Sequence, residues 1–174
     1  ADANGNGVLI TSDAFFTSTN NDIVDNLIGS FALQITAAGN GTGIRILTSG
    51  NSVRDNTIIN SGLDGVMLGV ADAHHNVIEH NRIGIRDTIC IGTFCFGGAA
   101  ANGRHGLFFD FGPHDNLVSN NTIRYNGGHG IFIFSDVGAT SPRNGLTGNS
   151  LYNNAGAGTR FLVYNGADND ADPA

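Results

Sequence analysis

Two histidines with charged neighbours are the residues of this chain best suited to acid–base chemistry. Asp64, His105 and His129 each stand directly before a glycine that opens a short apolar segment, so they occupy matching positions. Histidine exchanges protons near neutral pH, and carboxylate, arginine and tyrosine side chains can assist it. The candidate catalytic residues are Arg104, His105, Asp110, Tyr125 and His129. A polar turn has the same composition, so an acid–base site and a row of hydrogen-bonding turn residues both stay open.

Two interleaved sequence phrases place these residues. The first, Asn-x-Φ-x-x-Asn-x-Φ with Φ aliphatic, occurs five times, beginning at Asn21, Asn51, Asn76, Asn116 and Asn144. The second, Gly-Φ-x-Φ, begins at Gly7, Gly43, Gly65, Gly106 and Gly130, and a degenerate sixth copy begins at Arg160. The closest copies recur every 22 to 25 residues, roughly, and such self-similarity is typical of solenoids.

The repeat predicts the fold. Short segments of alternating apolar residues, separated by Asn and Gly, indicate strands and turns, and no segment has the pattern of a helix that could connect parallel strands. Equal strands at one period stack in register, so that each coil covers its neighbour. We therefore predict one all-β domain over residues 1–174, a single-stranded right-handed parallel β-helix of about six coils with an asparagine ladder. Its interior column is expected to hold Ile28, Ile58, Ile83, Ile123 and Leu151.

Two insertions and the tail interrupt the rhythm. Residues 86–103 are predicted to form an insertion loop, residues 136–143 a shorter one, and residues 166–174 an acidic tail. Cys90 and Cys95 favour a small disulfide ring made in an oxidising compartment, with two idle thiols as the alternative. The alternating oxygens of the tail could hold calcium, or the tail is a solvated terminus, and the residues concerned are Asp168, Asp170 and Asp172.

Alternation also predicts what faces outward. The strands that open with Gly-Φ-x-Φ turn one apolar row outward, and the candidate substrate-binding residues on or beside that row are Arg45, Asp64, Phe108, Phe132 and Phe134. Exposed apolar surface usually marks an interface, a groove or a covered face. Three explanations stay open: the Cys90–Cys95 loop folds over Met67 and Phe108, a second copy of the chain packs there, or the rings bind sugars.

Charge and hydropathy exclude several partners. The formal net charge is −7, with eight Lys plus Arg and no Lys among them, so nucleic acid is not an expected partner. No apolar run reaches the ~20 residues of a membrane span. The first residues lack a basic-then-apolar leader, so an exported chain would be present in its mature form.

Three stretches carry a family resemblance: Ser61-Gly-Leu-Asp-Gly65, Ala101-Asn-Gly-Arg-His-Gly106 and Tyr125-Asn-Gly-Gly-His-Gly130. From Gly62 to Phe134 the chain resembles the catalytic β-helix module of secreted mannuronan C5-epimerases and their alginate-lyase relatives. The resemblance implies a secreted or cell-surface protein acting on an acidic polysaccharide. A cation, here Arg104, would neutralise the sugar carboxylate, a base would remove the C5 proton, and an acid would complete epimerisation or elimination.

The chain departs from that family at its best-known motif. Where those enzymes carry Asp-Pro-His-Glu in one strand and a catalytic Asp in the next, this chain has Gly43-Ile-Arg-Ile-Leu47 and Gly69. Shifting the match by one coil places Asp110 at the Asp position but loses the other residues. Three hypotheses follow: a protein that binds or processes an acidic polysaccharide, a structural or adhesive β-helix that self-associates through its phenylalanine face as a homo-oligomer, and a fragment of a larger enzyme.

Overall fold

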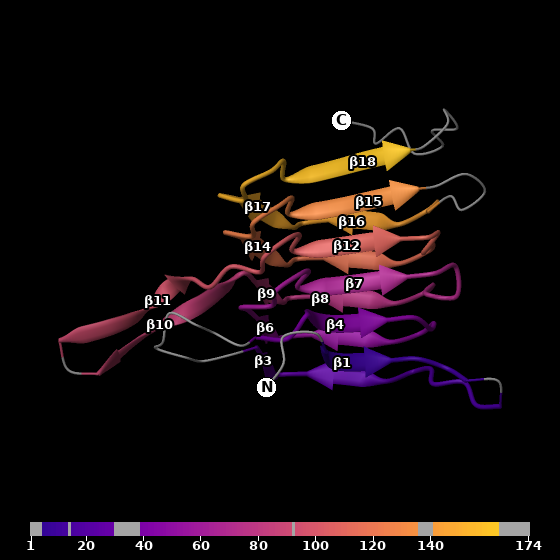
Figure 1. The fold of residues 1–174 in the computed structure, drawn as a ribbon, viewed down its shortest axis with the longest axis horizontal. Coiled ribbons are helices and arrows are strands. Elements are labelled where there is room, and N and C mark those ends of the chain that lie inside the picture. Colours follow the sequence, from indigo (N-terminus) through magenta and orange to yellow (C-terminus); the bar gives the residue numbers. More distant parts are fainter. Residues whose placement is uncertain (1–4, 14, 30–38, 92, 136–140, 164–174) are drawn as a thin grey trace.

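The computed structural model describes residues 5–13, 15–29, 39–91, 93–135 and 141–163. These residues form 18 strands and, within the described ranges, no helix. Three parallel sheets extend along one axis, and a two-stranded hairpin projects from the side (Figure 1). The predicted all-β parallel β-helix is confirmed.

We name the three parallel sheets A, B and C. Sheet A contains, in order, β1 (Asn6–Ile10), β4 (Thr42–Ile46), β7 (Val66–Gly69), β12 (Leu107–Asp110), β15 (Ile131–Ser135) and β18 (Thr159–Val163). Sheet B contains β2 (Asp22–Val24), β5 (Ser52–Arg54), β8 (Val77–Glu79), β13 (Leu117–Ser119) and β16 (Gly145–Thr147). Sheet C contains β3 (Leu27–Ile28), β6 (Thr57–Ile58), β9 (Arg82–Ile83), β14 (Thr122–Arg124) and β17 (Ser150–Tyr152).

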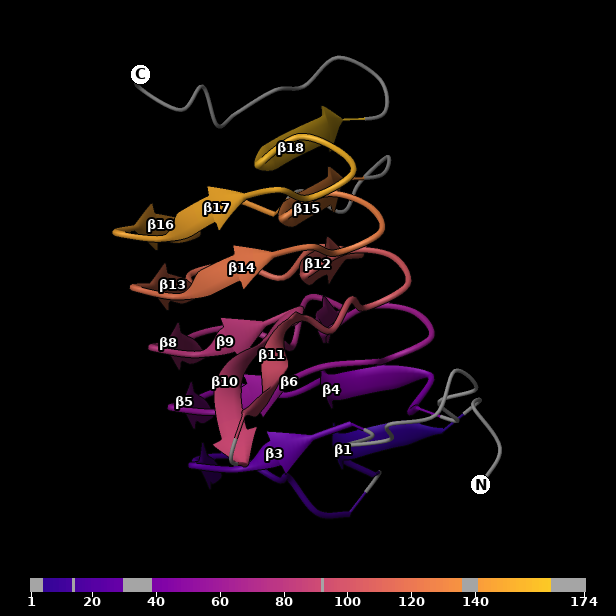
Figure 2. The same ribbon diagram turned by 90° about the vertical axis from the view of Figure 1, so that its left-hand side faces the viewer.

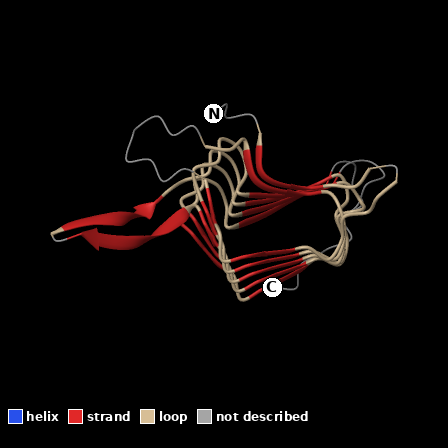
Figure 3. Cartoon of the chain, turned by 90° about the horizontal axis from the view of Figure 1, so that it is seen from below, coloured by secondary structure: helices blue, strands red, loops and turns tan. Residues whose placement is uncertain are grey.

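Each coil passes from sheet A through sheet B to sheet C and returns to sheet A one level higher (Figure 3). Seen along the axis, the strands of successive coils lie one behind another, and the same order of levels is visible in Figure 2. Among the three parallel sheets, sheet A has the longest strands, because the Gly-Φ-x-Φ phrase supplies alternating residues there. The repeat in the sequence is thus one coil of the solenoid.

The core is a set of apolar columns between the sheets. Ile58, Ile83 and Ile123 are fully buried in sheet C, where they pair directly with one another from coil to coil. Sheet A adds Phe109, the largest fully buried side chain, between Leu68 and Ile133. Burying one such side chain stabilises the fold by about 1.5–3 kcal/mol. The predicted interior column is present, and at its C-terminal end Leu151 is only partly buried.

Asparagine ladders hold the turns together. The backbone N–H of Asn51 and its Nδ2 donate to Oδ1 of Asn76, and Asn76 donates in the same way to Asn116. A second ladder joins Asn56, Asn81 and Asn121 with the same geometry. In many coils the residue directly before the ladder asparagine has a positive φ, as Asp55 and His80 do. Burial of these asparagines is tolerated because the hydrogen bonds of the side-chain amide replace those that water would make.

A third ladder lies between sheets C and A, and the sequence phrases did not reveal it. Asn102 Nδ2 donates to Asn126 Oδ1, and the backbone N–H and Nδ2 of Asn126 both donate to Asn154 Oδ1. Ser61 takes the equivalent place one coil earlier, where its backbone N–H donates to Asn102. The signal was an Asn four residues before the glycine of the Gly-Φ-x-Φ phrase, in the stretches that begin at Asn102 and Asn126.

The insertion predicted as a loop is mainly a hairpin. β10 (Ile85–Ile91) pairs antiparallel with β11 (Phe94–Ala99), and Cys90 stands opposite Cys95. β-Branched and aromatic residues, which favour strands, are frequent in both arms: Ile85, Thr88, Ile89 and Ile91 in β10 and Phe94 and Phe96 in β11. The two cysteine side chains lie outside the described part, so the disulfide stays a prediction. The shorter insertion at 136–143 is described only from Ser141 onward.

The last strand of sheet A is in a different register from the predicted one. The sequence phrase aligned Arg160 with Gly130, whereas the structure pairs Thr159 with Ile131 and Phe161 with Ile133. Gly158 is therefore the counterpart of Gly130. The shift of two residues keeps Phe161 on the inner face, because alternation has a period of two.

Candidate binding site on sheet A

The predicted column of Asp64, His105 and His129 is present at the turn that leads into sheet A. Asp64 Oδ1 accepts the backbone N–H of His105 at 3.0 Å, and His105 Nδ1 accepts the backbone N–H of His129 at 2.9 Å. His129 Nδ1 accepts the N–H of Ala157 at 2.8 Å. The imidazole rings of the two histidines stack, with centroids 5.3 Å apart and planes 5° apart. One side chain in each coil therefore caps one backbone donor of the next.

These bonds determine which nitrogen carries the proton in the neutral ring of each histidine. An Nδ1 atom that accepts a hydrogen bond carries no proton, so in the neutral ring the proton is on Nε2. For His105, burial, the Arg104 guanidinium and the neighbouring His129 lower the pKa to about 4. The ring is therefore neutral at physiological pH, with its Nε2–H available as a donor. Of the two open interpretations, the geometry favours turn residues that hydrogen-bond each other.

Arg104 and Asp64 form the charged part of the column. The Asp64 side chain is 2% exposed and the Arg104 side chain 46% exposed, and their closest atoms, Oδ2 and NH1, are 3.8 Å apart. Burial raises the pKa of Asp64, while the His105 backbone N–H and Arg104 act in the opposite direction. The Arg104 guanidinium also lies 5.3 Å from the centre of the Phe108 ring. Arg104 thus keeps a solvent-facing cation beside the aromatic residues.

The outward residues of sheet A form an aromatic cluster. Phe108 and Phe132 pair in register and stack with centroids 5.5 Å apart and planes 8° apart. Phe132 also contacts His105 at 4.8 Å, His129 at 5.4 Å and Phe134 at 6.4 Å between centroids. Because the two parallel rings cover each other's faces and Phe108 is 7% exposed, the cluster does not present a flat platform of ring faces. The expected sugar-stacking surface stays a prediction, and its accessible members are the part-exposed Phe132 and Phe134.

Cations continue the row toward both ends of the cluster. In the outward row of sheet A, Arg45 pairs with Leu9 and Met67, and Arg160 pairs with Phe132. Arg45 is half-buried and Arg160 is exposed. Asp110 is the last residue of β12, opposite Gly69, and this places it beside the outward row of sheet A, as predicted. Its side chain has interaction partners of its own.

Tyr125 belongs to another part of the surface. It follows β14 at the corner of sheet C, where its ring lies 5.0 Å from the Arg124 guanidinium. The same guanidinium lies 4.8 Å from the Tyr152 ring and donates to the Tyr152 hydroxyl. The structure therefore groups Tyr125 with sheet C and gives it a stacking partner there, while the rest of the predicted set lies on or beside the sheet A face.

The hairpin does not roof this face. Apart from its hairpin partner β11, β10 contacts β6, β9 and β14, which are all strands of sheet C. In Figure 3 the hairpin extends away from the solenoid on the side of sheet C, well apart from the outer face of sheet A. The explanation that the Cys90–Cys95 segment covers Met67 and Phe108 is therefore wrong.

A second histidine group, not assigned a role from the sequence, lies at the turn from sheet A to sheet B. The rings of His74 and His114 stack at 5.0 Å, and His114 Nδ1 lies 2.7 Å from Asp115 Oδ2. Arg143 donates to both Asp115 oxygens at 2.6 Å, and these two partners hold the pKa of Asp115 well below its usual range. The signal in the sequence was the equivalent position of these residues in successive coils, directly before the first ladder.

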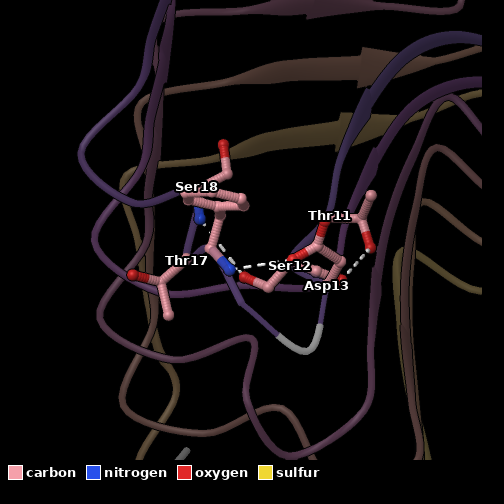
Figure 4. A pocket seen from close by; sticks show the side chains of 6 residues that line it. Thr11, Ser12, Asp13, Thr17 and Ser18 are labelled. Atoms are coloured by element: carbon pink, nitrogen blue, oxygen red, sulfur yellow. Dashed lines mark hydrogen bonds between the residues drawn. The ribbon is translucent and has the colours of Figure 1, made fainter.

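The described residues contain no group of three or more His, Cys, Asp or Glu side chains placed to hold a metal ion. Asp168, Asp170 and Asp172, the predicted calcium ligands, lie outside the described residues. A small hollow near the N-terminal end, at the turn after β1, is lined by Thr11, Ser12, Asp13, Phe16, Thr17 and Ser18 (Figure 4). Asp13 Oδ1 accepts the N–H groups of Phe15 and Phe16. The polar groups of this hollow thus serve the turn itself.

Comparison with known proteins agrees with this architecture. Residues 1–171 match the model of the right-handed beta helix region. This chain belongs to the right-handed β-helix family. No curated protein and no solved structure matched the chain. Within the described residues, no helix is long and apolar enough to cross a membrane. Membership in this family is compatible with a polysaccharide-related role in general.

Proposed function

We propose that this β-helix binds an acidic polysaccharide along the outer face of sheet A. The observation that carries the proposal is the row of hydrogen-bond donors beside the aromatic cluster. Arg104 contributes a half-exposed guanidinium, and His105 and His129 each contribute an Nε2–H because their Nδ1 atoms are occupied. Uronate chains present carboxylates and hydroxyls, which are the acceptors that such donors recognise.

Local charge supports an anionic ligand on a chain that is acidic as a whole. The net charge is −7, yet the outer face of sheet A and its leading turn hold Arg45, Arg104 and Arg160. The nearest carboxylates are Asp64, which is buried against Arg104, and Asp110. Cations gathered on one face raise the local concentration of an anion. The exposed parts of Phe132 and Phe134 would contact the apolar C–H groups of the sugar.

The proposal is binding without proton transfer through His105. A general base needs a free lone pair at the proton that it removes. His105 Nδ1 already accepts a backbone hydrogen bond, and its pKa of about 4 makes it a weak base at neutral pH. Proton NMR of polymannuronate in D₂O is expected to show no deuterium at C5 and no unsaturated ends after incubation with the protein.

Isothermal titration with oligomannuronate, oligogalacturonate and a neutral β-glucan oligomer tests the proposal. A uronate oligomer should bind and the neutral oligomer should not, and binding should weaken as salt increases. Arg104→Gln is expected to weaken binding about tenfold or more, because it removes a charge-assisted hydrogen bond. Phe132→Ala should weaken it by a smaller factor.

Arg54→Gln is the matched control. Arg54 lies on sheet B, where it is paired with Asp22 at 3.5 Å, and its replacement changes the net charge by the same amount. This variant should bind as the parent chain does. Equal weakening by Arg54→Gln and Arg104→Gln, or no uronate binding at millimolar ligand, would overturn the proposal.

A further inference from the structure

The two ends of the solenoid present complementary unpaired groups. In all three parallel sheets the edge strands come from the first and last coils: β1 and β18 in sheet A, β2 and β16 in sheet B, β3 and β17 in sheet C. An edge strand carries a row of N–H and C=O groups that can pair with another chain. Figure 1 shows β1 and β3 at one end of the stack and β17 and β18 at the other.

The ladders give this complementarity a direction. In every step that joins two asparagines, the earlier coil donates and Oδ1 of the later coil accepts, as from Asn21 to Asn51 and from Asn121 to Asn149. Among the hydrogen bonds of the described residues, nothing donates to Oδ1 of the first rung. Among the same hydrogen bonds, the backbone N–H groups of the last rung, at Asn144, Asn149 and Asn154, have no acceptor. The first coil thus offers acceptors at Asn21 and Asn26, and the last coil offers donors at Asn144, Asn149 and Asn154.

Apolar residues at both ends are incompletely covered. The inward-facing side chains packed against the core but only partly buried are Val8, Ile23, Leu146 and Leu151. All four belong to the first or the last coil. Phe161, the inward neighbour of Ile133, is 37% exposed, whereas Phe109 at the equivalent place in a central coil is fully buried. The last coil therefore lacks an apolar layer, whereas the gap at the first coil is confined to Val8 and Ile23, because Ile10 and Ile28 are only 5% and 6% exposed.

The end coils also differ in charge. Residues 5–29 contain Asp13, Asp22 and Asp25 and no arginine. Residues 141–163 contain Arg143 and Arg160 and no carboxylate. Asp22 is paired with Arg54 and Arg143 with Asp115, so the end charges that count are Asp13 and Asp25 at the first coil and Arg160 at the last. Their opposite sign favours contact of a first coil with a last coil over contact of like ends.

We propose that the chain associates head to tail with a second copy of itself. The last coil of one copy lies beneath the first coil of the next, so that β18 pairs with the partner's β1, β16 with its β2 and β17 with its β3, in parallel. The two ladders that begin at Asn21 and Asn26 continue across the contact at the usual ~4.8 Å spacing of strands, with Asn144 and Asn149 as their donors. The contact uses different surfaces on the two copies, and the free ends allow longer assemblies. It leaves the sheet A face open and is independent of polysaccharide binding.

Sedimentation velocity over about 5–500 µM protein tests the association. The parent chain should shift from monomer to dimer and longer species as its concentration rises, and added salt should weaken the shift. Val8→Glu blocks the first coil and Phe161→Glu blocks the last coil, because each places a charge in the uncovered apolar layer. Each variant alone should stay monomeric. Their mixture should form a one-to-one dimer and stop there, because one intact end of each kind remains.

Leu117→Glu is the matched control, since Leu117 is exposed on the outer face of sheet B in a central coil. This variant should associate as the parent chain does. Far-UV circular dichroism checks the fold of all variants, and if a charged variant unfolds, the milder pair Ile23→Thr and Leu151→Thr takes its place. A parent chain that stays monomeric at all concentrations overturns the proposal and means that other segments cover the ends. Association that persists in either blocked variant, or a control that fails to associate, also overturns it.

Discussion

At the scale of single residues, His105 shows how one side chain can look catalytic and serve the fold. It combines a lowered pKa, a neighbouring arginine and an aromatic contact, which are features of many active sites. Its Nδ1 nevertheless accepts the His129 backbone N–H, just as Asp64 accepts the backbone N–H of His105. The ring therefore acts as a rung, and only its Nε2–H is left for the binding that we propose.

The pKa of His105 makes the stability of the fold dependent on pH. In the unfolded chain the ring takes up a proton below about pH 6.5, whereas in the folded chain it resists protonation until about pH 4. The free energy of unfolding should therefore fall as the pH falls from 6.5 to 4. His105→Asn keeps an oxygen acceptor for His129 and should reduce that fall by roughly 1 kcal/mol, after allowance for solvent screening.

Urea unfolding at pH 7, 5.5 and 4.5 measures this effect. His105→Leu supplies the contrast, because it leaves the His129 N–H without its acceptor and should destabilise the protein by about 1–3 kcal/mol at pH 7. An unchanged pH profile in His105→Asn would mean that His105 is protonated normally in the folded protein.

At the scale of elements, the turn into sheet A depends on glycine because neighbouring coils approach closely. A Cβ on Gly106 would lie 2.2 Å from Ile123 Cγ2 and 2.7 Å from the Gly130 carbonyl oxygen. Gly65 and Gly130 meet the carbonyl of the next coil in the same way. The repeated glycine thus reflects the stacking distance of the coils rather than backbone conformation.

Gly106→Ala should destabilise the protein by about 2–3 kcal/mol, because neither the carbonyl nor the buried Ile123 can move away freely. Gly62→Ala is the control, since a Cβ there would meet only the Asn40 carbonyl oxygen at 3.7 Å. That change should be neutral or stabilise by up to about 1 kcal/mol. Thermal unfolding measures the stability of both variants. An equal loss of stability in Gly106→Ala and Gly62→Ala would contradict the steric explanation.

At the scale of the whole molecule, stability should decline from the middle of the solenoid to its ends. A central coil such as β7–β9 has a neighbour on both sides, whereas β1–β3 and β16–β18 have one. In a linear array, stability is approximately a sum of nearest-neighbour contacts. The end coils therefore open at lower free energy than the centre.

Hydrogen exchange followed by mass spectrometry measures this gradient. In dilute solution, amides of β1 and β18 should exchange at least about tenfold faster than those of β7 and β12. At high concentration the head-to-tail contact should slow exchange at both ends and leave the centre unchanged. Uniform protection in dilute solution would contradict a gradient that arises from coil stacking.

The sequence by itself determined the solenoid. Asn and Gly recur at one period with alternating apolar residues between them, and these local patterns specify turns and strands wherever they occur. It also determined that Asp64, His105 and His129 lie in one column, because equal positions in equal coils must stack. The ladder between sheets C and A is also encoded locally, by Asn102 and Asn126 at equal positions before Gly106 and Gly130, but neither residue belongs to the two repeated phrases.

The tertiary structure alone decided what those residues can do. Whether His105 is a base or a rung depends on the position of one backbone N–H in the next coil, and the types of residues do not specify it. The stacking of Phe108 against Phe132, the position of Tyr125 on sheet C and the direction of the 85–99 hairpin likewise depend on distances between coils. A periodic sequence fixes which residues share a column, whereas side-chain packing across columns fixes which atoms remain free to bind a ligand.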